Sequence, residues 1–192
     1  MAIFQFGDST VPYDLFLNMV DEDTLILLED SAQKNQWDQL IQEWSKNTDE
    51  KKTGKLCFIH GIKKSKDLVE NTVDDVQTLI QFIEGIGCHR VDLVGQTGKD
   101  ALILALAFQA PEKIRKIVIL DPSPLRWGES ESAKKISLNE IKNEVFVLCN
   151  AFDKKYSKVG AKELEKTLPQ AKVHELKESS SKEILEELIG FL

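Results

Sequence analysis

Residues 91–124 read VDLVGQTGKDALILALAFQAPEKIRKIVILDPSP, and no other part of the chain carries so clear a structural pattern. An apolar run ends at Gly95, residues 101–108 are apolar on all sides, and a second apolar run covers residues 114–120. Short β-branched runs bounded by turn signals are typical of buried strands, whereas a segment that is apolar all round is typical of a buried helix. The stretch predicts a strand, a sharp turn, a helix that stops before Pro111, and a second strand.

Apolar runs alternate with helical patterns along most of the remaining chain. The predicted strands cover residues 24–28, 55–59, 90–94, 114–120, 144–148 and 172–176. Helical spacing is found in Trp37, Leu40, Ile41 and Trp44, in Val73, Val76, Leu79, Ile80 and Ile83, and in residues 182–192. This alternation predicts an α/β fold, with a mostly parallel central sheet and helices on both faces.

The first residues follow a different pattern. Residues 2–6 and 13–17 read as two short strands, and Gly7, Asp8 and Ser9 between them are typical turn residues. We expect a hairpin at one edge of the sheet.

Size and charge limit what the chain can be. With 192 residues and 42% hydrophobic content, residues 1–192 are expected to form a single globular domain. The net charge of −7 argues against binding to nucleic acid, because there is no basic excess to neutralise phosphates. The longest apolar stretch, residues 101–110, is too short to span a bilayer, so we expect no membrane insertion.

The cysteine and histidine content bears on the compartment and on cofactors. Cys57, Cys88 and Cys149 cannot all pair, and free thiols fit a reducing, intracellular compartment such as the cytoplasm. No pair of cysteine or histidine residues has metal-ligand spacing, so neither a metal nor a cofactor is expected.

The turn itself reads Gly95, Gln96, Thr97, Gly98, Lys99, and this resembles the G-x-S-x-G turn of the α/β-hydrolase superfamily. Thr97 stands at the position of the nucleophilic serine, and Lys99 replaces the last glycine. The flanking sequences NTVDDVQTLIQFIEGIGCHRVDLVG and PEKIRKIVILDPSP are also similar to that family. The resemblance implies a hydrolase-like fold in which the lid, inserted by many relatives after the strand ending at Asp121, is absent or minimal.

The same resemblance assigns the other parts of the site. His60 and Gly61 resemble the oxyanion-loop motif, but only one helix fits between them and the strand at residue 90, whereas the fold needs a further strand there. The oxyanion strand is therefore assigned to residues 24–28, with Glu29 and Asp30 in place of a His-Gly pair. The segment NEVFVLCNAFDKKYS is similar to the strand and loop of the triad acid, which places Asp153 there.

The segment AKVHELKESSSKEILEELIGFL is similar to the last strand, the catalytic-histidine loop and the terminal helix of that family. This similarity puts Ser181 where the catalytic histidine is expected. A hydrolase of this type needs a nucleophile, a base and an oriented acid. Because the base and the serine are both missing, we expect no catalytic residues, and Thr97, Asp153 and Ser181 are vestigial triad positions. The expected function is that of an inactive protein that binds a protein partner or a small ligand. The expected ligand-binding residues are Glu29, Asp30, Gln96, Thr97, Gly98 and Lys99.

Alternative functions remain open. A weak esterase or thioesterase would use Thr97 with Asp153 and an unusual base such as His60. A subunit of a larger assembly is a further possibility. The helix start beside Lys99 is a potential site for a small anion, and Trp127 is either an exposed contact or buried over the site entrance.

Overall fold

A computed structural model describes residues 1–16, 24–28, 34–46, 55–60, 62–64, 72–96, 98–124, 137–151, 157–178 and 180–192. The expected site residues Glu29, Asp30, Thr97 and Asp153 lie outside these ranges, as does Trp127. Most of the segment expected to carry a minimal lid, residues 125–136, is also outside them.

Strands and helices alternate along the described chain. The strands are β1 (Ala2–Phe6), β2 (Ser9–Phe16), β3 (Thr24–Leu28), β4 (Lys55–Ile59), β5 (Lys63–Lys64), β6 (Val91–Gln96), β7 (Ile114–Leu120), β8 (Glu144–Cys149) and β9 (Ala171–Glu175). The α-helices are α1 (Lys34–Lys46), α2 (Thr72–Gly85), α3 (Asp100–Gln109), α4 (Ser157–Thr167) and α5 (Ser181–Phe191). The predicted strands and the predicted hairpin are confirmed, although β2 begins at Ser9, four residues earlier than expected.

All of these strands belong to one sheet. Its order is β1-β2-β4-β3-β6-β7-β8-β9, with β5 paired to β2. The pairs from β4 through β9 are parallel, and β2 is antiparallel to β1, β4 and β5. Along the sequence, β4 lies between β3 and β6. It is the further strand that was expected between residues 24–28 and the strand before the turn. The prediction of a mostly parallel α/β sheet is confirmed.

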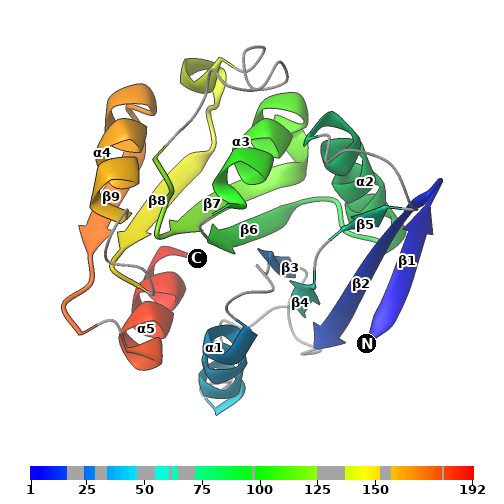
Figure 1. Ribbon diagram of the computed structural model, residues 1–192, viewed down its shortest axis with the longest axis horizontal. Coiled ribbons are helices and arrows are strands. Elements are labelled where there is room, and N and C mark those ends of the chain that lie inside the picture. The colour runs from blue at the N-terminus through cyan, green and yellow to red at the C-terminus, as the bar shows by residue number, and fades with distance from the viewer. Residues whose placement is uncertain are drawn as a thin grey trace.

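Helices cover both faces of the sheet (Figure 1). On one face, α2, α3 and α4 pack on a core that includes Phe82, Ile103 and Leu164. On the other, α1 and α5 pack together on a core that includes Leu40 and Leu188. Residues of β3 alternate between these two cores, because successive side chains of a strand point to opposite faces.

Some helices were easier to predict than others. The expected helices around residues 37–44, 73–83, 101–108 and 182–192 are confirmed, and Trp44 is buried as expected. Helix α4 was not predicted from the sequence, because few of its side chains are buried. The buried residues are Ser157, Gly160, Ala161 and Leu164. So sparse an apolar stripe gives weak helical periodicity.

The three cysteines are free, as expected, and all are buried. Burial raises the pKa of Cys57 to about 12, so its thiol stays protonated at neutral pH. In the described part of the chain, no helix is long and apolar enough to cross a membrane. Nor do the described histidine, cysteine and acidic residues form a group of three or more that could hold a metal ion.

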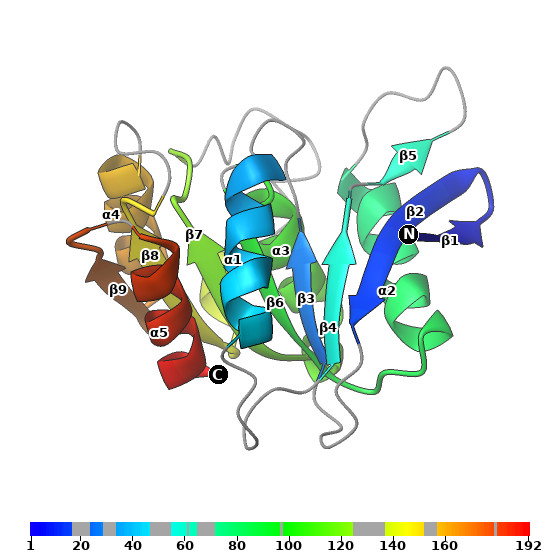
Figure 2. The ribbon, with the colours of Figure 1, turned by 90° about the horizontal axis from the view of Figure 1, so that it is seen from below.

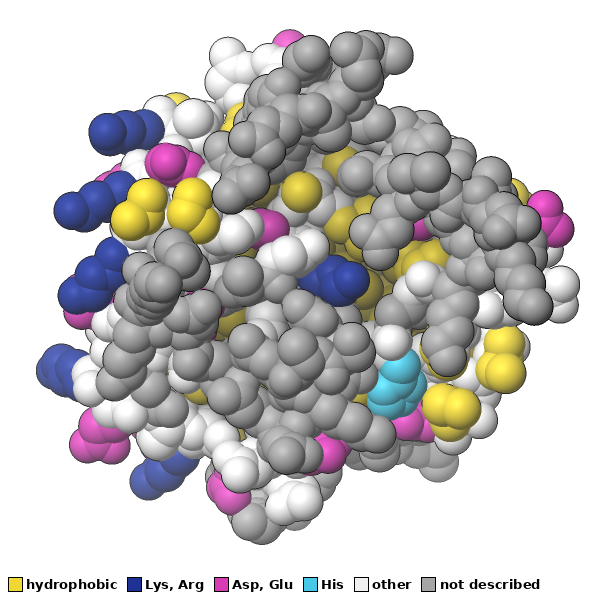
Figure 3. Space-filling view, viewed as in Figure 1, with side chains coloured by type: hydrophobic (Ala, Val, Ile, Leu, Met, Phe, Trp, Pro, Cys, Tyr) yellow, Lys and Arg dark blue, Asp and Glu magenta, His cyan; other side chains and the backbone are white. Residues whose placement is uncertain are grey.

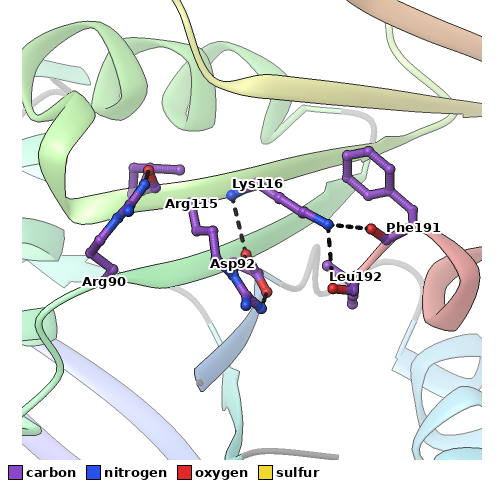
Figure 4. Close-up of polar contacts among 7 residues, drawn as sticks. Arg90, Asp92, Arg115, Lys116, Phe191 and Leu192 are labelled. Atoms are coloured by element: carbon purple, nitrogen blue, oxygen red, sulfur yellow. Dashed lines mark hydrogen bonds and ion pairs between the residues drawn. The ribbon is translucent and has the colours of Figure 1, made fainter. Parts of the chain in front are cut away.

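A buried ion pair joins β6 to β7 near their amino ends (Figure 4). The Asp92 side chain is only 3% exposed, and both of its oxygens accept hydrogen bonds from the Arg115 guanidinium, one of them with an N–O distance of 2.9 Å. The Lys116 amide also donates to Asp92, at 3.1 Å. The Lys116 ammonium donates to the Phe191 carbonyl at 2.6 Å and therefore ties the end of α5 to β7.

Replacing Arg115 by methionine should lower the free energy of unfolding by about 3 kcal/mol, because it leaves a buried carboxylate without its counter-charge. Urea denaturation measures this loss. The double variant Asp92→Leu/Arg115→Met should recover much of it, since both charges are then removed. Arg90→Met is the matched control: the exposed Arg90 makes one long contact, 3.4 Å, to the Ile114 carbonyl, so the change should cost no more than about 0.5 kcal/mol. Equal losses in Arg90→Met and Arg115→Met would contradict this account.

Candidate functional site

The site expected from the sequence lies at the carboxyl ends of the parallel strands, the usual place for ligands in such sheets. In Figure 2, β3 and β4 run upward, so this edge is at the top of that view. At the end of β6, the Lys99 amide donates to the Gln96 carbonyl at 2.8 Å and closes a four-residue turn. Gly98 is the third residue of this turn and has φ of 86°, a conformation that favours glycine.

Three of the expected ligand-binding residues thus meet at this turn. Gln96 is buried at the end of the strand, Gly98 is exposed, and Lys99 is half-buried at the N-cap position of α3. The structure does not describe Thr97 between them. The turn is therefore in the expected place, at the carboxyl edge and at the start of the central helix.

Close packing fixes the helix that follows. A Cβ atom on Gly95 would lie 2.1 Å from Cδ1 of Ile103, so α3 contacts β6 directly where the glycine leaves room. Ile103 itself is fully buried. A side chain at position 95 would therefore require the Ile103 side chain to move.

The first turn of α3 holds a buried carboxylate. Asp100 is 2% exposed; its Oδ1 accepts from the Ala101 amide at 3.1 Å, and its Oδ2 accepts from the amide and hydroxyl of Ser123 at 3.0 and 2.7 Å. Burial raises the pKa of Asp100, and the hydrogen bonds from Ser123 oppose that shift. Asp100 thus places a negative group at the positive end of the helix dipole and ties α3 to the segment after β7.

A second buried carboxylate lies where β7 ends. Asp121 is 1% exposed, and its Oδ1 accepts from the Ala151 amide at 2.9 Å and from the Ser157 hydroxyl at 2.7 Å. Asp121 and Asn150, the residues directly after β7 and β8, have φ of 49° and 61°. Aspartate and asparagine adopt this left-handed conformation more readily than other residues with a Cβ atom, and here it turns the chain sharply at the carboxyl edge.

The start of α4 packs tightly against the same segment. The Ser157 hydroxyl donates to Asp121 and also accepts a hydrogen bond from the backbone amide of Asn150 at 2.9 Å. A Cβ atom on Gly160 would lie 2.2 Å from the Pro122 carbonyl oxygen, so only glycine allows this approach. The ends of β7 and β8 and the start of α4 are held as one unit.

Polar contacts continue to the outermost strand on this side. The Asn150 amide side chain donates to Glu175 of β9 at 2.9 Å, and Glu175 pairs with Lys158 of α4 at 2.5 Å. The hydrogen bond from Lys158 is the main cause that lowers the pKa of Glu175. We call the set Asp100, Ser123, Asp121, Ser157, Asn150 and Glu175 the carboxyl-edge network. The sequence analysis did not identify it.

His60, the alternative base, directly follows β4, and its described side-chain contacts are with β2 and with Phe58. Its Nε2 lies 2.8 Å from Oδ2 of Asp14, a residue of β2, and its ring packs edge-on against Phe58 with centroids 4.8 Å apart. In the sheet, β2 is on one side of β4, and β3 and β6 are on the other. The hydrogen bond to Asp14 therefore directs this nitrogen toward the outer strands, in keeping with the structural role that a single histidine usually has.

The expected triad positions are not seen together. Ser181 is the first residue of α5, and its hydroxyl donates to Gln39 of α1 at 3.4 Å, so its described contact is with a neighbouring helix. Ser180 before it caps α5 by accepting from the Glu183 amide at 3.2 Å. Glu29, Asp30, Thr97 and Asp153 are outside the described residues, so their expected roles stay predictions.

The expected anion site beside Lys99 is disfavoured. The positive end of α3 already has an acidic side chain, that of Asp100, which accepts the Ala101 amide of the same helix turn. A second negative group would be repelled by this carboxylate when it is ionised.

Removing the Ser123 hydroxyl tests the link between α3 and β7. Ser123→Ala should lower the free energy of unfolding by about 2 kcal/mol at neutral pH, because a hydrogen bond to an ionised group is lost. The folded-state pKa of Asp100 is raised, and losing this donor raises it further, so the cost should shrink as pH falls and the carboxyl group becomes protonated. Urea denaturation at neutral and at mildly acidic pH measures both effects. Ser137→Ala is the control, since Ser137 bonds the uncharged Asn139 and its cost should not vary with pH.

Known proteins resemble this chain in structure rather than in sequence. No protein-family model matches it, and no curated protein sequence matches it either. A predicted CIB-like hydrolase from Thermoplasma acidophilum has a TM-score of 0.76 at 12% identity, over 99% of this chain and 95% of that one. A carboxylesterase of the ammonia-oxidizing thaumarchaeon Nitrososphaera gargenis has a TM-score of 0.71 at 13% identity, over 99% of this chain and 97% of that one.

A third similar structure is an α/β hydrolase enzyme from a Medee basin deep-sea metagenome library. It has a TM-score of 0.75 at 14% identity, and the match covers 99% of this chain and 96% of that one. The matches extend over nearly the whole of each chain, and the strand order and helix placement described above account for them. The chain has the α/β-hydrolase fold.

Proposed function

We propose that this protein is a catalytically inactive α/β-hydrolase-like protein that acts by binding. Its ligand is a small neutral molecule held by Gln96, Thr97, Gly98 and Lys99, together with Glu29 and Asp30, which follow the neighbouring strand β3 in the sequence. Alternatively, the bound molecule is a protein partner that contacts the same edge of the sheet. The vestigial triad positions Thr97, Asp153 and Ser181 take no part in chemistry.

The observation that carries the proposal is the buried Asp100 carboxylate. Acyl transfer builds negative charge on an oxygen next to the start of α3, and catalysis requires donors directed at that oxygen. In enzymes of this fold one donor is the amide of the residue after the nucleophile, which is Gly98 here, and the buried Asp100 lies two residues further along the chain. An ionised Asp100 would destabilise a nearby oxyanion, which disfavours the transition state more than it disfavours a neutral bound ligand.

The lack of a suitable base supports the same conclusion. The segment from residue 171 to 192 contains one histidine, His174, which lies within β9 and has its Nε2 3.6 Å from Glu187. The loop between β9 and α5 reads LKESS and has no histidine. His60 is bonded through Nε2 to Asp14 on the far side of β4. Among the described residues, neither His174 nor His60 is therefore placed as the base that a nucleophile at position 97 would need.

The competing proposal is a weak esterase or thioesterase that uses Thr97, Asp153 and His60. It is favoured by the similar structures, since several of these are described as carboxylesterases or hydrolases. Their identities of 12% to 14% support the fold and not the activity. If His60 were the base, Asp14 would be the acid that orients it, because its carboxylate already accepts a hydrogen bond from the His60 ring.

The proposal also covers the domain organisation, the compartment and the partners of the protein. We infer one domain over residues 1–192, and a reducing, intracellular compartment in which Cys57, Cys88 and Cys149 stay free. The acidic net charge of −7 favours partners other than nucleic acid. No cofactor enters the proposed binding function.

One probe, p-nitrophenyl butyrate, tests both parts of the proposal. We expect it to bind without release of p-nitrophenolate, and to shift the amide resonances of Gly98 and Lys99 but not those of Arg115 and Lys116 at the opposite edge. Lys99→Ala should weaken binding several-fold, because this half-buried side chain lines the turn. Lys162→Ala, an exposed lysine of α4, is the matched control and should leave the binding curve unchanged.

The outcomes separate the two halves of the proposal. Shifts that are absent, or that spread over both edges of the sheet, would remove the ligand site. Ester turnover that is lost in Thr97→Ala would remove the claim of inactivity. If turnover were also lost in His60→Ala and followed a titration near neutral pH, the esterase proposal would replace ours.

A further inference from the structure

Asp100 is a buried acidic residue whose hydrogen-bond partners carry no charge. Its side chain is 2% exposed, and it accepts from the amides of Ala101 and Ser123 and from the Ser123 hydroxyl. None of the cationic side chains that the structure describes forms an ion pair with it. The buried Asp92 at the opposite edge differs in this respect, because the Arg115 guanidinium pairs with it. An ionised Asp100 therefore keeps a negative charge that no neighbouring cation neutralises.

This charge lies next to the proposed ligand site. Asp100 directly follows the turn of residues 96–99. Its Cα atom is at most about 7 Å from that of Gly98, since each residue extends a chain by no more than about 3.6 Å. Between like charges about 7 to 10 Å apart in a protein, the repulsion is strong enough to weaken the binding of an anion by about tenfold or more.

Lys99 carries the opposite charge, but its influence on a ligand is weaker. It is half-buried at the N-cap position of α3, and none of the described carboxylates pairs with it. Water and salt screen a half-buried ammonium group more strongly than a buried carboxylate, because the effective dielectric constant is higher near solvent. For a ligand at the turn, we expect the repulsion from Asp100 to exceed the attraction of Lys99 for an anion.

The face around the turn suits a ligand with an apolar part. The carboxyl edge is at the top of Figure 2, so it faces the viewer in Figure 3. Near the middle of Figure 3, hydrophobic side chains lie beside a Lys or Arg side chain. Sites for small molecules are commonly lined by apolar side chains with a few polar groups among them.

We propose that Asp100 makes the carboxyl edge selective for uncharged acyl compounds, such as esters and amides with a short apolar chain, over the corresponding carboxylates. This inference rests on the binding function proposed above, and it adds the class of ligand and the residue that selects it. Asp100 acts through its charge and needs no contact with the ligand. A protein with this selectivity binds an ester but not the carboxylate that hydrolysis of the ester yields.

Butyramide and butyrate test the selectivity, because they have nearly the same size and shape and differ by one unit of charge. Their binding at neutral pH is followed through the amide resonances of Gly98 and Lys99. The natural chain should bind butyramide about tenfold or more tightly than butyrate. The preference should persist in about 1 M sodium chloride, where a Debye length of about 3 Å screens surface charge far more than a buried carboxylate. This measurement separates Asp100 from the net charge of −7.

The variant Asp100→Asn should bring the two affinities to within about threefold, mainly because butyrate binds more tightly. Glu144→Gln is the matched control: it removes one negative charge from an exposed residue at the opposite edge and should keep the preference of the natural chain. A gain in butyrate affinity cannot result from misfolding, and circular dichroism verifies the fold of both variants.

The outcomes separate this inference from the binding function itself. If neither compound shifts Gly98 and Lys99, the ligand site is wrong and the selectivity is wrong with it. If both compounds bind equally, the binding function stands and the selectivity is overturned. A preference for butyramide that disappears in about 1 M salt, or that remains in Asp100→Asn, would likewise overturn the role of Asp100.

Discussion

The direct contact between α3 and β6 is the constraint on which the rest of the molecule depends. Gly95 leaves the space that the Ile103 side chain fills against the strand, so the helix packs directly on the strand it follows. That approach places the turn at residues 96–99 at the centre of the carboxyl edge. It also brings Asp100 at the start of the helix within reach of Ser123 beyond the next strand.

The carboxyl-edge network then extends this order across the sheet. Asp100 fixes the segment after β7, Asp121 at the start of that segment fixes the start of α4, and Asn150 carries the contacts to β9. These groups are buried, and a buried polar group is stabilising only when its partners are present. The network stabilises the carboxyl edge of the sheet, where ligands bind in folds of this kind, and two of its buried members are carboxyl groups. Under the proposed function, an edge that holds the buried carboxyl groups of Asp100 and Asp121 is better suited to binding a neutral molecule than to stabilising an oxyanion.

The sequence predicts the sheet well and the network poorly, for one physical reason. β3, β4 and β7 were predicted with their observed bounds, because strands buried on both faces read as unbroken apolar runs. The contact of Asp100 with Ser123 joins residues 23 positions apart, and no local pattern encodes it. A usable signal was present: Asp121 and Asn150 directly follow buried strands, where an isolated Asp or Asn indicates a sharp turn. α4 was missed because few of its side chains enter the core.

His60 links the carboxyl edge of the sheet to the hairpin of β1 and β2. Through Asp14 it joins the end of β4, at the carboxyl edge, to β2, which carries the hairpin with β1. The contact is half-buried, and hydrogen bonds from the Met1 amino group and then from His60 lower the pKa of Asp14. A residue that would be the base of an esterase is therefore used to hold the outer strands against the sheet.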